Sequence, residues 1–287
     1  MKTKQRGSGW SIGAVFSLYK IFGYRFIYIL MYPVTFFYFL FASNVKESLK
    51  EYYSIIGKPF SNAIYFEHLR IFAICMVDRF ITKLTKEEYF FENESKKTMS
   101  NLLEEGCIVL HSHYGGWAAS ANNDTKDILN KVNVVMQEAL LESIKDIENS
   151  KESEENLNII DLKRGGVAVS IEIANALINN EIVAIMGDRA SNKRAEIEMD
   201  FFGKKANFNK NPFQIAYKLN KPILVYFVVF ISMKKYKIEY IKIELNKDVP
   251  EKEAVLEAMQ RYISLYEKIL INNPNQWFNF YKFWEKQ

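Results

Sequence analysis

The sequence predicts an α/β protein in which helices flank a central mixed β-sheet, with an aromatic helical arm in front. From residue 106 onward, short apolar runs alternate with helical stretches, a pattern typical of a sheet with helices on its faces. The 287 residues are 49% hydrophobic, which is enough to bury a sizeable core. Much of the aromatic content lies near the two ends of the chain. We therefore expect an arm over residues 1–45 and an α/β domain over residues 46–287.

The arm contains two apolar stretches. Trp10–Phe22 is helix-like, and an uncharged run from Phe26 to Ala42 follows, interrupted by Pro33. As a helix, that run spans about 25 Å, just under the roughly 30 Å of a bilayer core. It allows a short transmembrane helix, an interfacial hairpin kinked at Pro33, a signal peptide or a buried core helix. A signal peptide fits poorly because no small-residue cleavage site follows, so we expect a membrane-associated arm.

Charge and cysteine content restrict the partners. The net charge of +4 is too mild for a nucleic-acid-binding protein, but it suits an anionic membrane surface or an acidic carrier protein. Lys2, Lys4 and Arg6 precede the apolar arm and favour a cytoplasmic N-terminus. Cys75 and Cys107 are isolated, so they form neither a disulfide framework nor a zinc site, and we expect a cytoplasmic domain.

The helices and strands follow in order. Residues 46–84 are predicted to form amphipathic helices, the second starting at Pro59. Short apolar or alternating runs predict strands at Cys107–Leu110, Val132–Met136, Leu157–Asp161, Ile182–Met186, Glu196–Phe202 (as an edge strand), Pro222–Ile231 and Tyr236–Leu245. Helices are expected at 137–148, Gly165–Leu177, Pro212–Leu219 and 251–271, with a polar loop at 149–156.

The sharpest local feature is the run from His111 to Trp117, which reads His-Ser-His-Tyr-Gly-Gly-Trp. It follows a predicted strand and precedes a helix, and active sites of α/β sheets form at such junctions. Gly115 and Gly116 let the backbone turn tightly beside a substrate. A histidine there can act as an acid or base near neutral pH. We expect His113 to be functional and His111 to pack or cap the turn.

The same two histidines allow a metal interpretation, as in a metal-dependent hydrolase. His111 and His113 are two residues apart on an extended chain, so they point to one side. Zinc would need at least a third ligand, such as Asp188 or His68. The spacing does not demand a metal, and we expect none.

Three further features could line the same edge of the sheet as His113. Lys163-Arg164-Gly165-Gly166 and Gly187-Asp188-Arg189 each follow a predicted strand. Arginines there suit a phosphate of a lipid head group or of a phosphopantetheine arm, or they pair with surface acids. The third feature runs from Phe201 to Phe208 and is either an apolar loop over an acyl chain or a hairpin.

In this order the motifs resemble the lysophospholipid acyltransferase superfamily, in particular the late acyltransferases of lipid A biosynthesis. The resemblance covers nearly the whole chain, from the aromatic arm to the ending. The family's His-x-Gly-Asn-Trp-Glu motif corresponds to His113-Tyr114-Gly115-Gly116-Trp117-Ala118. The other similar segments are Arg164-Gly165-Gly166, Gly187-Asp188-Arg189, Phe202-Gly203-Lys204-Lys205-Ala206 with Pro212, and Pro274-Asn275-Gln276-Trp277-Phe278-Asn279-Phe280-Tyr281-Lys282-Phe283-Trp284.

The resemblance implies a glycerolipid acyltransferase-like fold on the cytoplasmic face of the inner membrane. It also implies a reaction in which His113 removes a proton from a hydroxyl or amine of a lipid or glycolipid acceptor. That atom attacks the thioester of an acyl carrier protein or coenzyme A, without a further cofactor. With Asp188 beside His113, the substrate-binding residues would be Arg164, Arg189, Gly115, Gly116, Trp117, Phe202 and Lys204.

One position departs from the family pattern. The acid that orients the histidine is Ala118 here. Three explanations stay open: another acid such as Asp124 or Asp188 takes over, the acceptor is reactive enough without one, or the chain is an inactive homologue that binds lipid or carrier protein. Loss of the orienting carboxylate in a serine-protease triad costs about 10⁴ in rate, so the choice matters.

Overall fold

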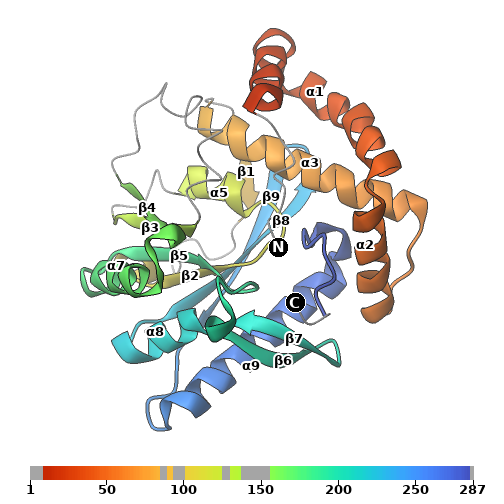
Figure 1. Cartoon of the computed structure of the whole chain (residues 1–287). Helices are drawn as coiled ribbons and strands as arrows, with labels where there is room; N and C mark the ends of the chain where they lie inside the picture. The colour runs from red at the N-terminus through yellow and green to blue at the C-terminus, as the bar shows by residue number, and fades with distance from the viewer. Residues whose placement is uncertain (1–8, 85–88, 93–100, 125–129, 137–155, 285–287) are drawn as a thin grey trace.

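The computed structural model describes residues 9–84, 89–92, 101–124, 130–136 and 156–284. Seven of the described strands form one sheet in the order β1-β9-β8-β2-β5-β3-β4 (Figure 1). Neighbouring strands run parallel except β8 and β9, which form an antiparallel hairpin, so the sheet is mixed as predicted. The strands are β1 (Phe90–Glu92), β2 (Ile108–His111), β3 (Val132–Met136), β4 (Leu157–Asp161), β5 (Ile182–Met186), β8 (Ile223–Ser232) and β9 (Lys235–Ile243).

Helices cover both faces of this sheet. Strand β8 shows why: Val225 and Phe227 belong to one buried cluster, whereas Leu224 and Tyr226 between them belong to another. Because side chains alternate along a strand, each face needs its own cover. One cluster includes residues of α2 (Ser43–Ile55), α7 (Gly166–Ile178), α8 (Asn211–Leu219) and α9 (Glu251–Asn272), and the other includes residues of α1 (Gly9–Phe41) and α3 (Asn62–Leu84), with α5 (Trp117–Asp124) packed against it.

The predicted strand at Glu196–Phe202 is real but was placed wrongly. Strands β6 (Glu196–Phe201) and β7 (Lys204–Asn209) form a separate two-stranded antiparallel sheet instead of an edge of the central one. The hairpin alternative for Phe201–Phe208 is therefore correct. The buried face of the hairpin explains the error, because Phe201 and Phe208 are fully buried and pack against Tyr266 and Tyr262 of α9.

The arm is a long helix bent at a glycine. Within α1 the residue with non-helical angles is Gly23 (φ 72°, ψ −179°), whereas Pro33 lies inside the helix. The alternative of a hairpin at Pro33 was therefore wrong, because the helix continues through this residue. The non-helical bend lies between the two apolar stretches, at a glycine that tolerates positive φ.

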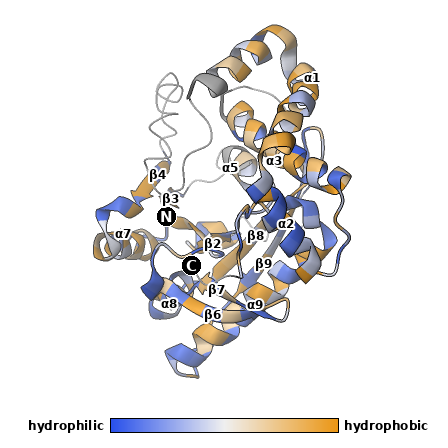
Figure 2. Cartoon of the chain, turned by 45° about the vertical axis from the view of Figure 1, so that its right-hand side comes forward, coloured by the Kyte–Doolittle hydropathy of each residue, from blue (hydrophilic) through white to orange (hydrophobic). Residues whose placement is uncertain are grey.

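Only one face of α1 packs on the protein. Its buried residues Tyr24, Ile27, Met31 and Thr35 follow helical spacing and face α3. The helix is largely apolar elsewhere too, as Figure 2 shows. Large exposed apolar side chains include Ile21, Phe22, Ile29, Phe36, Phe37, Leu40 and Phe41. The buried-core alternative is excluded, and Gly13–Phe41 is long and apolar enough to cross a membrane by length and composition alone.

Two parts of the sequence prediction lie outside the described residues. These are the helix at 137–148 with residues 149–155 of the loop after it, and the basic residues Lys2, Lys4 and Arg6. The boundary between residues 45 and 46 stays a prediction.

Candidate active site

The site forms where two neighbouring parallel strands end. His111 at the end of β2 pairs in register with Met186 at the end of β5. The chain continues beyond each strand for two residues, to His113 and to Asp188. The Gly187 N–H donates to the His111 carbonyl at 2.8 Å, which keeps the two segments side by side. Parallel register therefore brings together residues that are far apart in the sequence.

The turn after His113 needs its two glycines for packing. Gly115 has φ +57°, and a Cβ there would lie 1.9 Å from the Val228 carbonyl oxygen. A Cβ on Gly116 would lie 2.2 Å from the Tyr236 ring. Their N–H groups donate to the carbonyls of Gln276 (3.0 Å) and Val228 (2.9 Å). Both glycines thus let the turn pack closely against β8 and against the C-terminal segment 274–284, here called the chain ending. Their contact with substrate stays a prediction.

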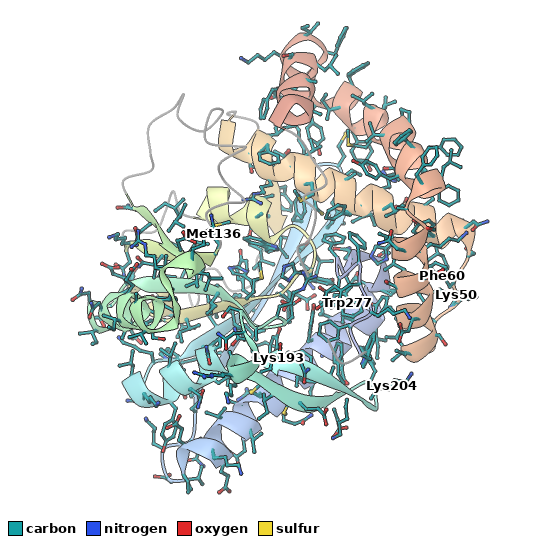
Figure 3. The ribbon with its side chains drawn as sticks, in the orientation of Figure 1. Lys50, Phe60, Met136, Lys193, Lys204 and Trp277 are labelled. Carbon is teal, nitrogen blue, oxygen red and sulfur yellow. The ribbon has the colours of Figure 1, made fainter. Side chains whose placement is uncertain are left out.

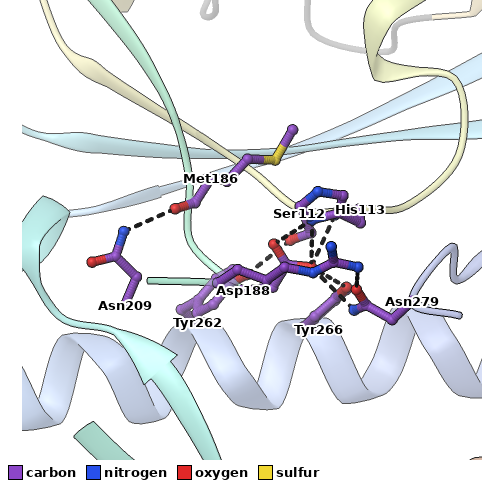
Figure 4. Close-up of polar contacts among 9 residues, drawn as sticks. Ser112, His113, Met186, Asp188, Asn209, Tyr262, Tyr266 and Asn279 are labelled. Carbon is purple, nitrogen blue, oxygen red and sulfur yellow. Dashed lines mark hydrogen bonds and ion pairs between the residues drawn. The ribbon is translucent and has the colours of Figure 1, made fainter. Parts of the chain in front are cut away.

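His113 and Asp188 form a hydrogen-bonded pair (Figure 4). The ring Nδ1 of His113 lies 3.0 Å from Asp188 Oδ1 and 3.1 Å from Oδ2, and the His113 backbone N–H donates to Oδ2 at 3.0 Å. The His113 side chain is 32% exposed, whereas that of Asp188 is fully buried. Because an ionised carboxylate only accepts hydrogen bonds, Nδ1 carries the proton and Nε2 remains as an acceptor.

Asp188 is held in its charged form. Burial alone raises the pKa of this carboxyl, but attraction to His113 whenever its ring is protonated, the hydrogen bonds from His113 and the charge of Arg189 together outweigh burial. The pKa of Asp188 therefore lies well below its usual range. A buried carboxylate that stays ionised suits a histidine that must accept a proton and become positive.

Two side chains that the sequence did not single out complete the surroundings of Asp188. Asn279 Nδ2 donates to Asp188 Oδ2 at 3.2 Å, and the Tyr266 hydroxyl donates to the same oxygen at 3.4 Å. Arg189 donates to the side-chain oxygen Oδ1 of Asn279 and lies over the Tyr281 ring, 4.6 Å from its centroid. The available signal was the segment 274–284, which carries part of the family resemblance and contains Asn279, but nothing in the sequence pairs Asn279 with Asp188.

The chain ending is tied to the His113 turn. The Phe278 N–H donates to the His113 carbonyl at 2.8 Å. The Gln276 amide group bonds both the N–H and the carbonyl of Phe230, each at 2.8 Å. His68 on α3 bonds the Trp277 carbonyl through Nε2 at 2.8 Å. The ending therefore packs inside the molecule, with Trp277 only 1% exposed (Figure 3).

The other expected site residues lie further out. Arg164 is exposed after β4, three strands from β2 or about 14 Å by strand spacing, and pairs with Glu172 at 2.8 Å. Phe202 is half-buried at the β6–β7 turn, and exposed Lys204 stands at the periphery (Figure 3). The structure brings Asp188 and Arg189 to the neighbourhood of His113, but not Arg164.

His111 has a packing position. It is 7% exposed, between the rings of Trp117 (centroids 5.4 Å apart) and Tyr226 (5.3 Å). Burial lowers the pKa of His111 to about 4, so it is neutral at physiological pH. Within the described residues, no three His, Cys, Asp or Glu side chains are grouped to hold a metal ion. The side chain of Asp124, the other acid considered for orienting His113, lies outside the described part.

A comparison with protein-family models identifies the family. The family model described as bacterial lipid A biosynthesis acyltransferase matches residues 46–286. A search among curated proteins found no match. The matched range contains His113, Asp188 and Asn279.

Proposed function

We propose that this chain, which belongs to the bacterial lipid A biosynthesis acyltransferase family, transfers a fatty-acyl group to a lipid or glycolipid acceptor with His113 as general base. The observation that carries the proposal is the hydrogen bond of 3.0 Å between His113 Nδ1 and the buried Asp188 carboxylate. The pair supplies an oriented base although the family acid is Ala118 here.

The reaction follows from the protonation of this pair. His113 Nε2 accepts the proton of an acceptor hydroxyl or amine as that atom attacks the thioester carbonyl. Asp188 stabilises the imidazolium that forms, because the carboxylate stays charged and in contact. The tetrahedral intermediate then collapses, the C–S bond breaks, and the imidazolium returns its proton to the leaving thiolate. The products are the acylated lipid and the free thiol of the donor.

The donor in this proposal is an acyl thioester of acyl carrier protein or coenzyme A. Trp117, Phe202, Gly115 and Gly116 would lie along the substrate, and Arg164, Arg189 and Lys204 would meet its anionic groups. Since Arg164 lies about three strand spacings from β2, it would contact a part of the substrate remote from the reacting atoms. No further cofactor is needed for this chemistry.

The arm would hold the enzyme at the cytoplasmic face of the inner membrane. Its exposed face carries large apolar side chains, among them Ile29, Phe37 and Phe41, that have no cover from the described part of the protein. Burying such side chains in a bilayer interface stabilises the bound state by about 25 cal/mol for each Å² of apolar surface. Acceptor and acyl chain would then reach the site from the membrane.

The second candidate is a binding-only homologue that holds lipid or carrier protein without turnover. Ala118 is the observation that favours it, because the family acid is missing at that position. The Asp188 contact weakens this alternative, since it supplies a carboxylate at the same nitrogen of His113 that an orienting acid would use.

The test is acyl transfer from a radiolabelled acyl carrier protein thioester, and in parallel from acyl-CoA, into total membrane lipid. Wild type should produce a labelled lipid whose mass identifies the acceptor, and His113→Ala should not. Label transfer by correctly folded His113→Ala at the wild-type rate would reject His113 as the base. No label from either protein with either donor would support the binding-only alternative.

A further inference from the structure

Asn279 lies between Arg189 and Asp188 and is hydrogen-bonded to both. It is 1% exposed and belongs to the C-terminal segment 274–284, whereas Asp188 and Arg189 follow β5 in the sequence. The arginine donates to the Asn279 side-chain oxygen, and the Asn279 nitrogen donates to Asp188 Oδ2 at 3.2 Å. The amide thus bridges Arg189 and Asp188.

The chemistry of the two neighbours fixes which way this amide points. A guanidinium only donates hydrogen bonds, and an ionised carboxylate only accepts them. The side chain between them must therefore accept on one side and donate on the other, which a carboxamide does. An aspartate in this place could accept from Arg189 but could not donate to Asp188.

The bridge is anchored at both ends. Arg189 lies over the Tyr281 ring, and the backbone N–H of Phe278, next to Asn279, donates to the His113 carbonyl at 2.8 Å. Asp188 Oδ2 also accepts from the His113 N–H and from the Tyr266 hydroxyl. With Oδ2 held by these donors, the carboxylate stays oriented so that Oδ1 and Oδ2 lie 3.0 and 3.1 Å from His113 Nδ1.

We propose that Asn279 is a positioning residue for the acyl-transfer reaction: it fixes the Asp188 carboxylate against His113, so that the histidine keeps its proton on Nδ1 and presents Nε2 to the acceptor. Arg189 donates to the Asn279 side-chain oxygen and so orients the amide. This inference rests on the proposed function for its kinetic part, whereas the protonation of the ring can be measured without turnover.

The first test is kinetic, with Asn279→Ala, Asn279→Asp and the control Asn275→Ala from the same segment. Asn279→Ala should lower kcat about tenfold to a hundredfold with little change in KM, because a hydrogen bond to a charged group is lost. Asn279→Asp keeps the side-chain volume but replaces the donor, so it should be at least as impaired. Asn275→Ala should keep wild-type kcat. Wild-type kcat in Asn279→Asp would overturn the proposal.

The second test reads the ring nitrogens by NMR of ¹⁵N-histidine-labelled protein in detergent. The chain has 3 histidines, and His68 provides an internal reference, because its Nε2 faces a carbonyl and must carry the proton. Wild-type His113 should show the opposite, Nδ1–H tautomer. In Asn279→Ala it should become a tautomer mixture while the His68 signals stay unchanged. An unchanged His113 tautomer, or equal changes at all histidines, would overturn a positioning role.

The two tests separate the failures of the two proposals. If wild type transfers no acyl group but the His113 tautomer depends on Asn279, the proposed function fails and the positioning role stands. If wild type is active and the His113 tautomer does not depend on Asn279, the proposed function stands and the positioning role fails.

Discussion

The Asp188 carboxylate holds His113 at two points, the backbone N–H and the ring Nδ1. The first bond fixes where the residue sits, and the second fixes which ring nitrogen carries the proton. Because Asp188 follows β5 and is not on the helix that follows His113, the orienting acid reaches the histidine from the end of the neighbouring strand. The predictions below follow from this arrangement and its surroundings.

Ala118→Glu should have little effect on kcat. The nitrogen that an acid at position 118 would orient is already bonded to Asp188, and Nδ1 has a single proton to donate. Steady-state acyl transfer by this variant beside wild type checks the expectation. Activity that appears only in Ala118→Glu would instead support the binding-only alternative.

Arg164→Gln should raise KM about tenfold and leave kcat unchanged, because a charge-assisted contact remote from the reacting atoms contributes equally to substrate and transition state. The fold should tolerate the change, since exposed ion pairs such as the one with Glu172 contribute about 0–1 kcal/mol. Arg261→Gln, on the exposed side of α9, is the matched control. An unchanged KM would remove Arg164 from the substrate site.

Alanine substitutions at Gly115, Gly116 and Gly166 should distinguish glycines needed for close packing from a glycine with open space around it. Gly115→Ala should cost about 3 kcal/mol or more, because it combines a positive φ with a clash against a backbone oxygen. Gly116→Ala should cost about 1–3 kcal/mol, because the Tyr236 ring must move.

Gly166→Ala is the control for this series. Nothing lies within 4 Å of its Cβ position and it begins α7, so its stability should stay within about 1 kcal/mol of wild type. Denaturant unfolding of the three variants measures these differences. Equal losses at positions 115 and 166 would contradict the packing account.

The buried carboxyl of Asp78 should make stability depend on pH. It accepts hydrogen bonds from the hydroxyls of Tyr24 (2.6 Å), Tyr89 (2.9 Å) and Tyr236, and burial raises its pKa to about 6 although these bonds lower it. The native state therefore holds this proton more tightly than the unfolded chain. The resulting stabilisation is fully present below about pH 4 and is lost as the pH rises through about 6.

Asp78→Asn removes this dependence. Between pH 4 and pH 7, the free energy of unfolding of the variant should rise relative to wild type by about 2 kcal/mol, because most of the difference between the native and unfolded pKa values takes effect in this interval. Burial lowers the pKa of His68 and His111 to about 4, so protonation of these histidines at low pH destabilises both proteins. Because the effect is the same in wild type and variant, it cancels in the difference between their free energies of unfolding. Denaturant titrations at several pH values check this, and a difference that does not vary with pH would contradict it.

The spacing of apolar residues predicted most of the fold, because each helix or strand buries one face and its apolar residues recur at a regular interval along the chain. The strand at Ile182–Met186 and the helix at Pro212–Leu219 are examples, and both were found within two residues of their expected ends. Strand order and strand β1 were not predicted. Three residues, Phe90–Glu92, are too few to show alternation, and pairing is decided by contacts between distant segments.

The site was predictable only in part for the same reason. Asp188 closely follows a predicted strand, and the ends of neighbouring parallel strands lie close together. Its position at the same edge of the sheet as His113 was therefore predictable. Asn279 and Tyr266 lie on the chain ending and on α9, and their approach to Asp188 depends on tertiary packing. The bend at Gly23 was missed because proline is the stronger general signal for a kink, although glycine supplied the required angle.

The most direct test of the account is the kcat of Asp188→Asn, compared with His113→Ala and with the double variant, each shown to be folded by circular dichroism. If His113 and Asp188 act as one unit, Asp188→Asn should lose about 10⁴ in kcat, as orienting carboxylates do in serine-protease triads. The double variant should then be little worse than His113→Ala alone. Wild-type turnover by Asp188→Asn, or losses that simply multiply in the double variant, would contradict the claim that Asp188 works through His113.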